Sequence, residues 1–105
     1  MTWNLSAYID DQIRMWMKER GWEVTRTDYD FGSRIYSWRH TAPSGKSLTL
    51  RIAQQVLDEY PAFVVLYYLD ILRVASALRR NPGANLVVRQ RDTAVVLEED
   101  EPAGE

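Results

Sequence analysis

Cysteine is absent from the 105 residues, and histidine occurs once, at His40. The lack of cysteine excludes a disulfide scaffold and a cysteine-ligated zinc or iron–sulfur site. A single histidine also excludes any site for which one chain must supply two or more His or Cys ligands. We therefore expect no metal ion and no cofactor, and we favour binding over catalysis.

Long apolar runs are also missing. The most apolar stretch, residues 62–69 (AFVVLYYL), is followed directly by Asp70 and then by Arg73. A membrane-spanning helix needs about 20 mostly uncharged residues, so this stretch predicts a buried helix of a globular protein. The first residues, MTWNLSAYIDDQ, carry neither a basic region nor an apolar core typical of a secretory signal. We expect a cytoplasmic protein without a membrane partner.

The charges are nearly balanced, with 13 Lys and Arg against 15 Asp and Glu, but they are unevenly distributed. Five of the acids fall in residues 98–105 (EEDEPAGE), which also contain Pro and Gly and predict a disordered acidic tail. Residues 1–97 predict a single domain, because chains of about 100 residues usually form one. Without the tail, 13 basic and 10 acidic residues remain, which predicts a slightly basic folded body.

The hydrophobic patterns predict an α+β fold that begins with a helix. Leu5, Ile9, Ile13 and Trp16 recur at helical spacing, which predicts an amphipathic helix over about residues 4–20. Gly21 is a typical helix stop. Alternating patterns follow at residues 22–28, 34–41 and 47–52, and turn residues separate them, which predicts a three-stranded antiparallel meander.

The second half predicts a long buried helix and a closing hairpin. Residues 61–80 are apolar on nearly every side and end at Asn81-Pro82-Gly83, which is typical of a helix end. Two β-branched runs within residues 86–97, separated by Arg91 and Asp92, predict a C-terminal β-hairpin. Residues 53–60 fit either the end of the third strand or a short helix.

One face of the predicted sheet is polar and forms the candidate binding site. If the aromatic and aliphatic residues of the strands face the helices, the other face presents Glu23, Thr25, Thr27, Ser37, Arg39, Thr41, Ser47, Thr49 and Arg51. Ser, Thr and Arg side chains donate to phosphates, which receive most protein contacts to nucleic acids. The sequence predicts a small non-enzymatic binding module that contacts nucleic acid through Arg39, Arg51, Thr25, Thr49 and Lys46. A half-solvated sheet without function is the simpler interpretation of the same residues.

A second function class rests on the apolar helix. Asp70 and Arg73 lie three residues apart and predict either an ion pair or a subunit seam, because buried charge is costly unless it is paired. Twelve aromatic residues are many for a chain of this size, and aromatic side chains are enriched at interfaces. The alternative prediction is a homodimeric protein-interaction or inhibitor module that uses this helix.

Short motifs for catalysis are incomplete. Gly45-Lys46-Ser47 lacks the earlier glycine of a phosphate-binding loop, because His40 stands at that position. Asp28 and Asp30 are close enough in sequence to suggest a Mg²⁺ site, but no lysine follows at position 32, as a nuclease core of that type needs. A metal-dependent enzyme at these two aspartates remains the weakest of the three hypotheses.

Overall fold

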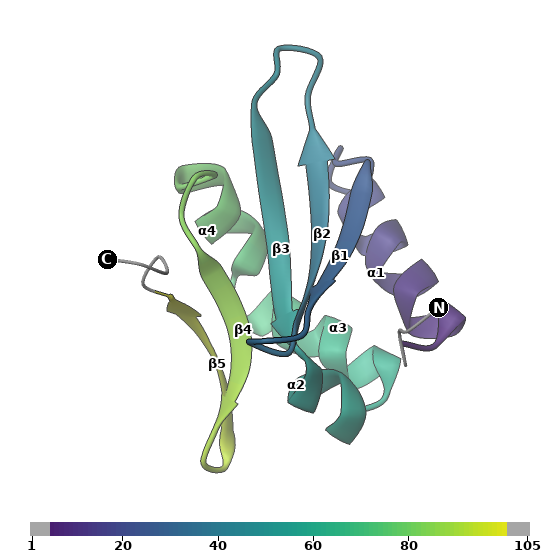
Figure 1. Ribbon diagram of the computed structural model, residues 1–105, viewed down its shortest axis with the longest axis vertical. Helices are drawn as coiled ribbons and strands as arrows, with labels where there is room; N and C mark the ends of the chain where they lie inside the picture. Colours follow the sequence, from purple (N-terminus) through teal and green to yellow (C-terminus); the bar gives the residue numbers. More distant parts are fainter. Residues whose placement is uncertain (1–4, 101–105) are drawn as a thin grey trace.

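A five-stranded mixed sheet with the order β1-β2-β3-β4-β5 organises the structure. The computed structural model describes residues 5–100, which contain four helices and five strands. All four helices lie behind the sheet in Figure 1, so the other face of the sheet is open. The predicted α+β class is confirmed.

The first helix, α1 (Ala7–Lys18), forms where helical periodicity predicts it. The Ser6 hydroxyl accepts a hydrogen bond from the Ile9 amide at 3.1 Å and caps the helix N-terminus. Ile9, Ile13, Trp16 and Met17 are buried against the rest of the core. Gly21 follows the helix with φ of 85°, a conformation that glycine adopts without steric cost.

The three-stranded meander is also confirmed, with β1 at Arg26–Asp30, β2 at Ile35–Thr41 and β3 at Ser47–Ala53. The first strand begins four residues later than predicted. Its register pairs Thr27 with Trp38 and Arg26 with Arg39. Because a one-residue shift exchanges the two faces of a strand, Thr27 faces the helices and Arg26 lies on the open face, opposite to the prediction.

The predicted continuous helix over residues 61–80 is wrong. The chain forms α2 (Gln54–Glu59), α3 (Ala62–Ile71) and α4 (Val74–Arg80), and Ala53 is the last residue of β3. The break between α3 and α4 is at Arg73, whose φ of 56° is left-handed and interrupts the helix. The change of direction lets Val74 and Leu78 of α4 be fully buried. No helix within residues 5–100 is long and apolar enough to cross a bilayer.

The C-terminal hairpin is confirmed as β4 (Leu86–Arg91) and β5 (Ala94–Glu99). Strand β4 joins the meander in parallel to β3, with Arg51 opposite Val87 and Ile52 opposite Val88. The helices therefore form a crossover between parallel neighbours, which such a connection requires. Glu98 and Glu99 belong to β5, so they are not part of the disordered tail predicted for residues 98–105. Residues 101–105, the rest of that prediction, lie outside the described part.

Candidate functional site

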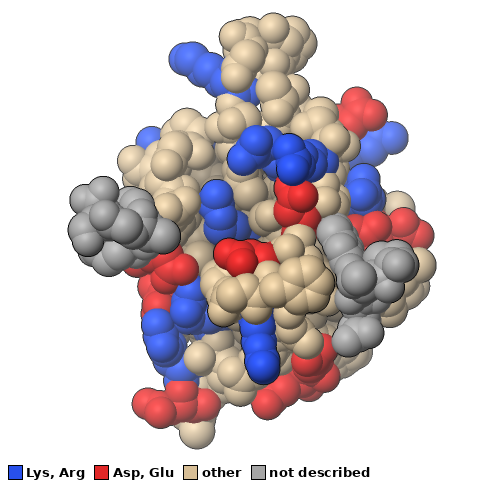
Figure 2. All heavy atoms as spheres, in the orientation of Figure 1, with Lys and Arg blue, Asp and Glu red and all other residues tan. Residues whose placement is uncertain are grey.

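The open face of the sheet is lined by charged and small polar residues from all five strands. The register assigns to this face every second residue of each strand. Its polar members are Arg26, Asp28, Asp30, Ser37, Arg39, Thr41, Ser47, Thr49, Arg51, Arg89, Arg91 and Glu98. Figure 2 looks onto this face and shows basic and acidic side chains interspersed across it. The face is therefore not a uniformly positive surface.

Three of the five arginines on the open-face strands are held by acids. Arg26 Nε lies 2.8 Å from Asp28 Oδ2. Arg89 Nη2 lies 2.6 Å from Asp100 Oδ2, and its Nε lies 3.4 Å from Glu98 Oε1. Arg91 Nε donates to Glu98 Oε2 at 3.0 Å. These guanidinium groups already have an anionic partner within the protein.

The other two arginines, Arg39 and Arg51, have no ion-pair partner within residues 5–100. Arg39 pairs with Thr49 across the ladder and Arg51 with Ser37, so the arginines are diagonal neighbours on β2 and β3. Burial lowers the pKa of Arg51, and the nearby charge of Arg39 lowers it further. The negative charge of Asp100 raises the pKa of Arg51, but this is the smallest of the three effects. The Asp100 carboxylate is hydrogen bonded to Arg89. Two neighbouring like charges thus face solvent without an acid bound between them.

The other predicted contact residues lie at different distances from this pair. Thr49 is mostly buried on the open face between the two arginines, with 8% of its surface exposed. The hydroxyl of Thr25 donates to the Arg39 carbonyl oxygen at 3.1 Å, next to β1. Lys46 lies in the β2–β3 turn, at the far end of the hairpin. Thr49, Arg39 and Arg51 are brought together, Thr25 reaches the backbone of Arg39 at the edge next to α1, and Lys46 is apart from them.

A hollow on the open face lies beside Arg51. This open-face cavity has a volume of about 340 Å³. Its lining combines hydroxyl, amide, guanidinium and carboxylate groups with two aliphatic side chains: Asp30, Ser33, Ile35, Ser37, Arg51, Asn85, Val87 and Asp100. The Asp30 carboxylate accepts a hydrogen bond from the Gly32 amide at 2.9 Å, which is the main cause of its lowered pKa. Arg51 is the cation of this cavity.

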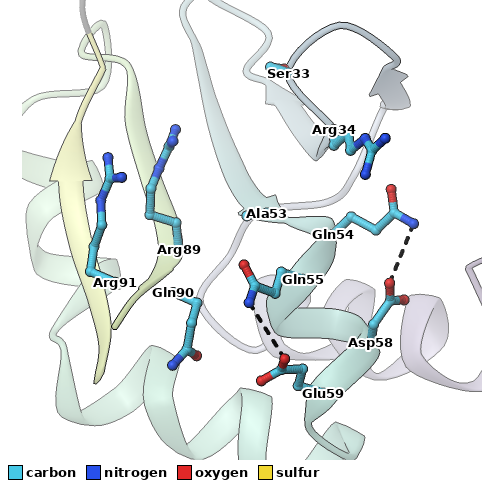
Figure 3. A pocket seen from close by; sticks show the side chains of 10 residues that line it. All are labelled: Ser33, Arg34, Ala53, Gln54, Gln55, Asp58, Glu59, Arg89, Gln90 and Arg91. Atoms are coloured by element: carbon cyan, nitrogen blue, oxygen red, sulfur yellow. Dashed lines mark hydrogen bonds between the residues drawn. The ribbon is translucent and has the colours of Figure 1, made fainter. Parts of the chain in front are cut away.

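A second cavity, the α2–β4 cavity, adjoins the first at Ser33. It has a volume of about 480 Å³ and lies at the carboxyl ends of β3 and β4 (Figure 3), lined by Ser33, Arg34, Ala53, Gln54, Gln55, Asp58, Glu59, Arg89, Gln90 and Arg91. The side-chain amides of Gln54 and Gln55 donate to Asp58 and Glu59, at 3.4 and 3.5 Å. Cations and acids both line this cavity, so it has no evident preference for an anion.

Sequence reasoning missed the open-face residues that β4 contributes. Asn85, Val87 and Arg89 reach the site because β4 pairs in parallel with β3, and Ser33 reaches it from the β1–β2 turn. The signal that could have found the β4 residues is the helical segment between the third strand and the hairpin. Such a connection is long enough to cross over the sheet and return parallel to the strand that precedes it.

The structure also corrects the predicted basic body. Residues 5–100 hold all 13 Lys and Arg and 13 of the 15 Asp and Glu, so this part of the chain is formally neutral. The prediction assigned Glu98, Glu99 and Asp100 to the tail, whereas Glu98 and Asp100 are ion-paired to arginines of β4. Any attraction for an anion therefore comes from the local arrangement of Arg39 and Arg51.

The two residues predicted as an ion pair or seam lie at the end of α3. Asp70 Oδ1 accepts hydrogen bonds from Trp16 Nε1 at 3.0 Å and Arg20 Nη2 at 3.1 Å. The Arg20 guanidinium also lies 4.0 Å from the centre of the Trp16 ring. Arg73 is exposed, and no described acid pairs with it. The carboxylate of Asp70 thus joins α3 to Trp16 of α1 and to Arg20 just after it, and not to Arg73.

The single histidine and the two aspartates considered for a Mg²⁺ site have structural contacts. His40 Nδ1 lies 2.8 Å from the Glu23 carbonyl oxygen, Asp28 pairs with Arg26, and Asp30 accepts from Gly32. In the described part of the chain, no group of three or more His, Cys, Asp or Glu side chains is arranged to hold a metal ion.

Replacing Arg91 with Gln is expected to raise the pKa of Glu98 toward the ordinary range of a glutamate. The hydrogen bonds from Arg91 are the main cause of the lowered Glu98 pKa, since they stabilise the ionised carboxylate. In the wild type this stabilisation is present above the unfolded-state pKa of Glu98 and is lost as the pH falls through its folded-state pKa. Carboxyl ¹³C NMR titration measures the change. The lowered pKa of Asp30, which depends on Gly32 and Ser33, serves as the internal control and is expected to stay constant.

Comparisons of the chain with protein-family models, with curated proteins and with solved structures find no match.

Proposed function

We propose that the protein is a small non-enzymatic binding module that takes the phosphate groups of a nucleic acid on the open face of its sheet. Arg39 and Arg51 make the principal contacts. Thr25 and Thr49 support them, and the open-face cavity next to Arg51 receives an uncharged part of the ligand, because the acids Asp30 and Asp100 also line it. Guanidinium groups suit this role because they bind phosphate oxygens through two parallel hydrogen bonds.

The observation that carries the proposal is the difference between paired and unpaired arginines on one face. Arg26, Arg89 and Arg91 each have an acid within ion-pair distance, whereas Arg39 and Arg51 have none within residues 5–100. Placing two cations side by side, one of them half-buried, opposes folding because the charges repel and lose hydration. A bound phosphate removes the repulsion and replaces the lost water contacts with hydrogen bonds to its oxygens.

The neutral charge of the described chain sets the expected strength and salt dependence of binding. A dedicated nucleic-acid domain usually carries a strongly basic surface, so this face is expected to contact few phosphates. Two phosphate contacts on a single strand predict a slope of about −1.4 for log K against log salt concentration, since each contributes about −0.7. We expect weak binding that is strongest at low ionic strength.

Fluorescence anisotropy with a labelled oligothymidylate of about 20 nucleotides tests the proposal, with salt varied from about 20 to about 200 mM. Arg39→Gln and Arg51→Gln are each expected to weaken binding and to reduce the salt slope by about half. Arg26→Gln removes the same charge from the same face at a paired position, so it is the matched control and is expected to have little effect. Equal losses in all three variants, or no binding at the lowest salt, would contradict the proposal.

A further inference from the structure

Large hydrophobic side chains are exposed on the side of the molecule opposite the proposed binding face. Among the described residues, six large hydrophobic side chains are strongly exposed, and five of them belong to α1 and α3. These five, which we name the α1–α3 apolar surface, are Tyr8, Met15, Phe63, Tyr67 and Ile71, with exposures of 66, 54, 74, 60 and 51%. A concentration of this kind is typical of an interaction site, whereas single exposed hydrophobic residues are common on any protein.

Helices α1 and α3 lie side by side and run in the same direction. Tyr8, at the start of α1, lines a cavity together with Pro61 and Ala62 at the start of α3. At the other end, Trp16 of α1 donates to Asp70 of α3. Their outward residues therefore adjoin across the two helices.

The exposed residues of each helix form a stripe. Phe63, Tyr67 and Ile71 follow one another at intervals of four residues on α3, and Tyr8 and Met15 are seven residues apart on α1, so each set lies on one side of its helix. The opposite side of α3 carries Ala62, Val65 and Leu69, which are buried in the core. Helix α3 is thus apolar on two sides, and residues 5–100 cover only one of them. A helix of this kind needs a second apolar surface packed against its exposed side.

The charges at the two ends of α3 indicate that a second copy of the chain packs against this exposed side. Asp58, which precedes the helix, lines a cavity together with Tyr8 and Ala62, and Arg73 follows the helix. No described residue forms an ion pair with Asp58 or Arg73. If two copies of α3 pack antiparallel about an axis near Tyr67, Phe63 of one copy lies against Ile71 of the other. Arg73 of each copy then lies near Asp58 at the start of the partner helix.

We propose that the α1–α3 apolar surface binds a second copy of the chain and forms a two-fold symmetric dimer. In a two-fold symmetric dimer the same surface of both subunits forms the interface, so this surface must be complementary to itself. A surface with an apolar centre and opposite charges at its two ends meets this requirement. The dimer leaves the open face of the sheet free on both subunits, because the helices lie behind the sheet (Figure 1). The inference stands independently of the proposed phosphate binding.

Sedimentation equilibrium of the full chain, from about 1 μM to about 1 mM, tests the dimer. The wild type is expected to dimerise, and Tyr67→Glu is expected to raise the dissociation constant at least about 30-fold, because it brings two carboxylates together near the axis. Phe31→Glu is the matched control, since Phe31 is 65% exposed but lies in the β1–β2 turn. It is expected to leave the dissociation constant unchanged.

A charge exchange tests the antiparallel arrangement without altering the apolar residues. Arg73→Glu is expected to weaken the dimer about tenfold, and adding Asp58→Arg to the same chain is expected to restore it. Circular dichroism of each variant checks that the fold is kept. A wild type that remains monomeric up to the highest concentration would overturn the proposal and assign the surface to a different partner. Dimerisation that Tyr67→Glu leaves intact would also overturn it.

Discussion

Replacing Trp38 with Ala is expected to lower the free energy of unfolding by about 3–5 kcal/mol. Trp38 lies in the middle of β2, faces the helices and is fully buried. The substitution removes the largest of the fully buried side chains and leaves a cavity next to Tyr36, whose ring centre lies 6.4 Å away. Small domains have a total stability of about 5–15 kcal/mol, so this loss is a large part of the whole.

Urea unfolding of the wild type and the variant measures the loss, as a shift of the midpoint at an unchanged slope. Trp38→Phe keeps an aromatic ring but removes the indole N–H, which donates to Asp10 Oδ1 at 2.9 Å. We expect this variant to be destabilised less than Trp38→Ala, because Asp10 keeps its second contact, to Arg14 Nε at 3.0 Å. A loss below about 1 kcal/mol for Trp38→Ala would contradict the assigned position of this ring in the core.

Helix α1 shows how much local signals predict when they agree. The spacing of Ile9, Ile13 and Trp16 gives the buried face, and Gly21 gives the end. Ser6 adds a cap that only the structure makes visible. Each signal depends on residues within a few positions of one another, so no distant part of the chain is needed to interpret it.

Strand β1 shows why the candidate site was partly misassigned. The segment before and within β1 contains two alternations of opposite parity, Trp22 with Val24 and Thr27 with Tyr29. Because Trp22 and Val24 are the more apolar residues, the sequence predicted that their alternation sets the face toward the helices. Within the strand, however, Thr27 and Tyr29 face the helices, and Tyr29 packs against Tyr36 with ring centres 4.4 Å apart. Cross-strand partners decide the register, and they lie outside the segment whose pattern is being interpreted.

The break at Arg73 has no counterpart in the local sequence. Arginine is a good helix former, and no Gly, Pro or Asn stands between Ile71 and Val74 to signal an end. The left-handed conformation of Arg73 costs free energy that the burial of Val74 and Leu78 offsets. The position of β4 beside β3, and the pairing of its arginines with Glu98 and Asp100, depend likewise on contacts between distant segments. Sequence patterns predicted the elements of this half, but neither their junctions nor their neighbours in the sheet.

Replacing Leu69 with Ala is expected to lower the free energy of unfolding by about 2–5 kcal/mol. Leu69 is fully buried on the inner side of α3 and belongs to the hydrophobic core. Ile71, two residues further along the same helix, is 51% exposed on its outer side. Since both substitutions replace a four-carbon side chain by Ala in the same helix, helix propensity changes the two variants similarly, and their difference measures burial.

Urea unfolding at a dilution below the dissociation constant of the proposed dimer gives both values for the isolated chain, so that contacts with a second copy do not enter. Ile71→Ala is expected to change the free energy of unfolding by less than about 0.5 kcal/mol under these conditions. At concentrations where the proposed dimer forms, the loss caused by Ile71→Ala is expected to grow, because binding to the folded state adds to its stability. Equal losses for the two variants at high dilution would mean that the outer side of α3 is covered within the single chain.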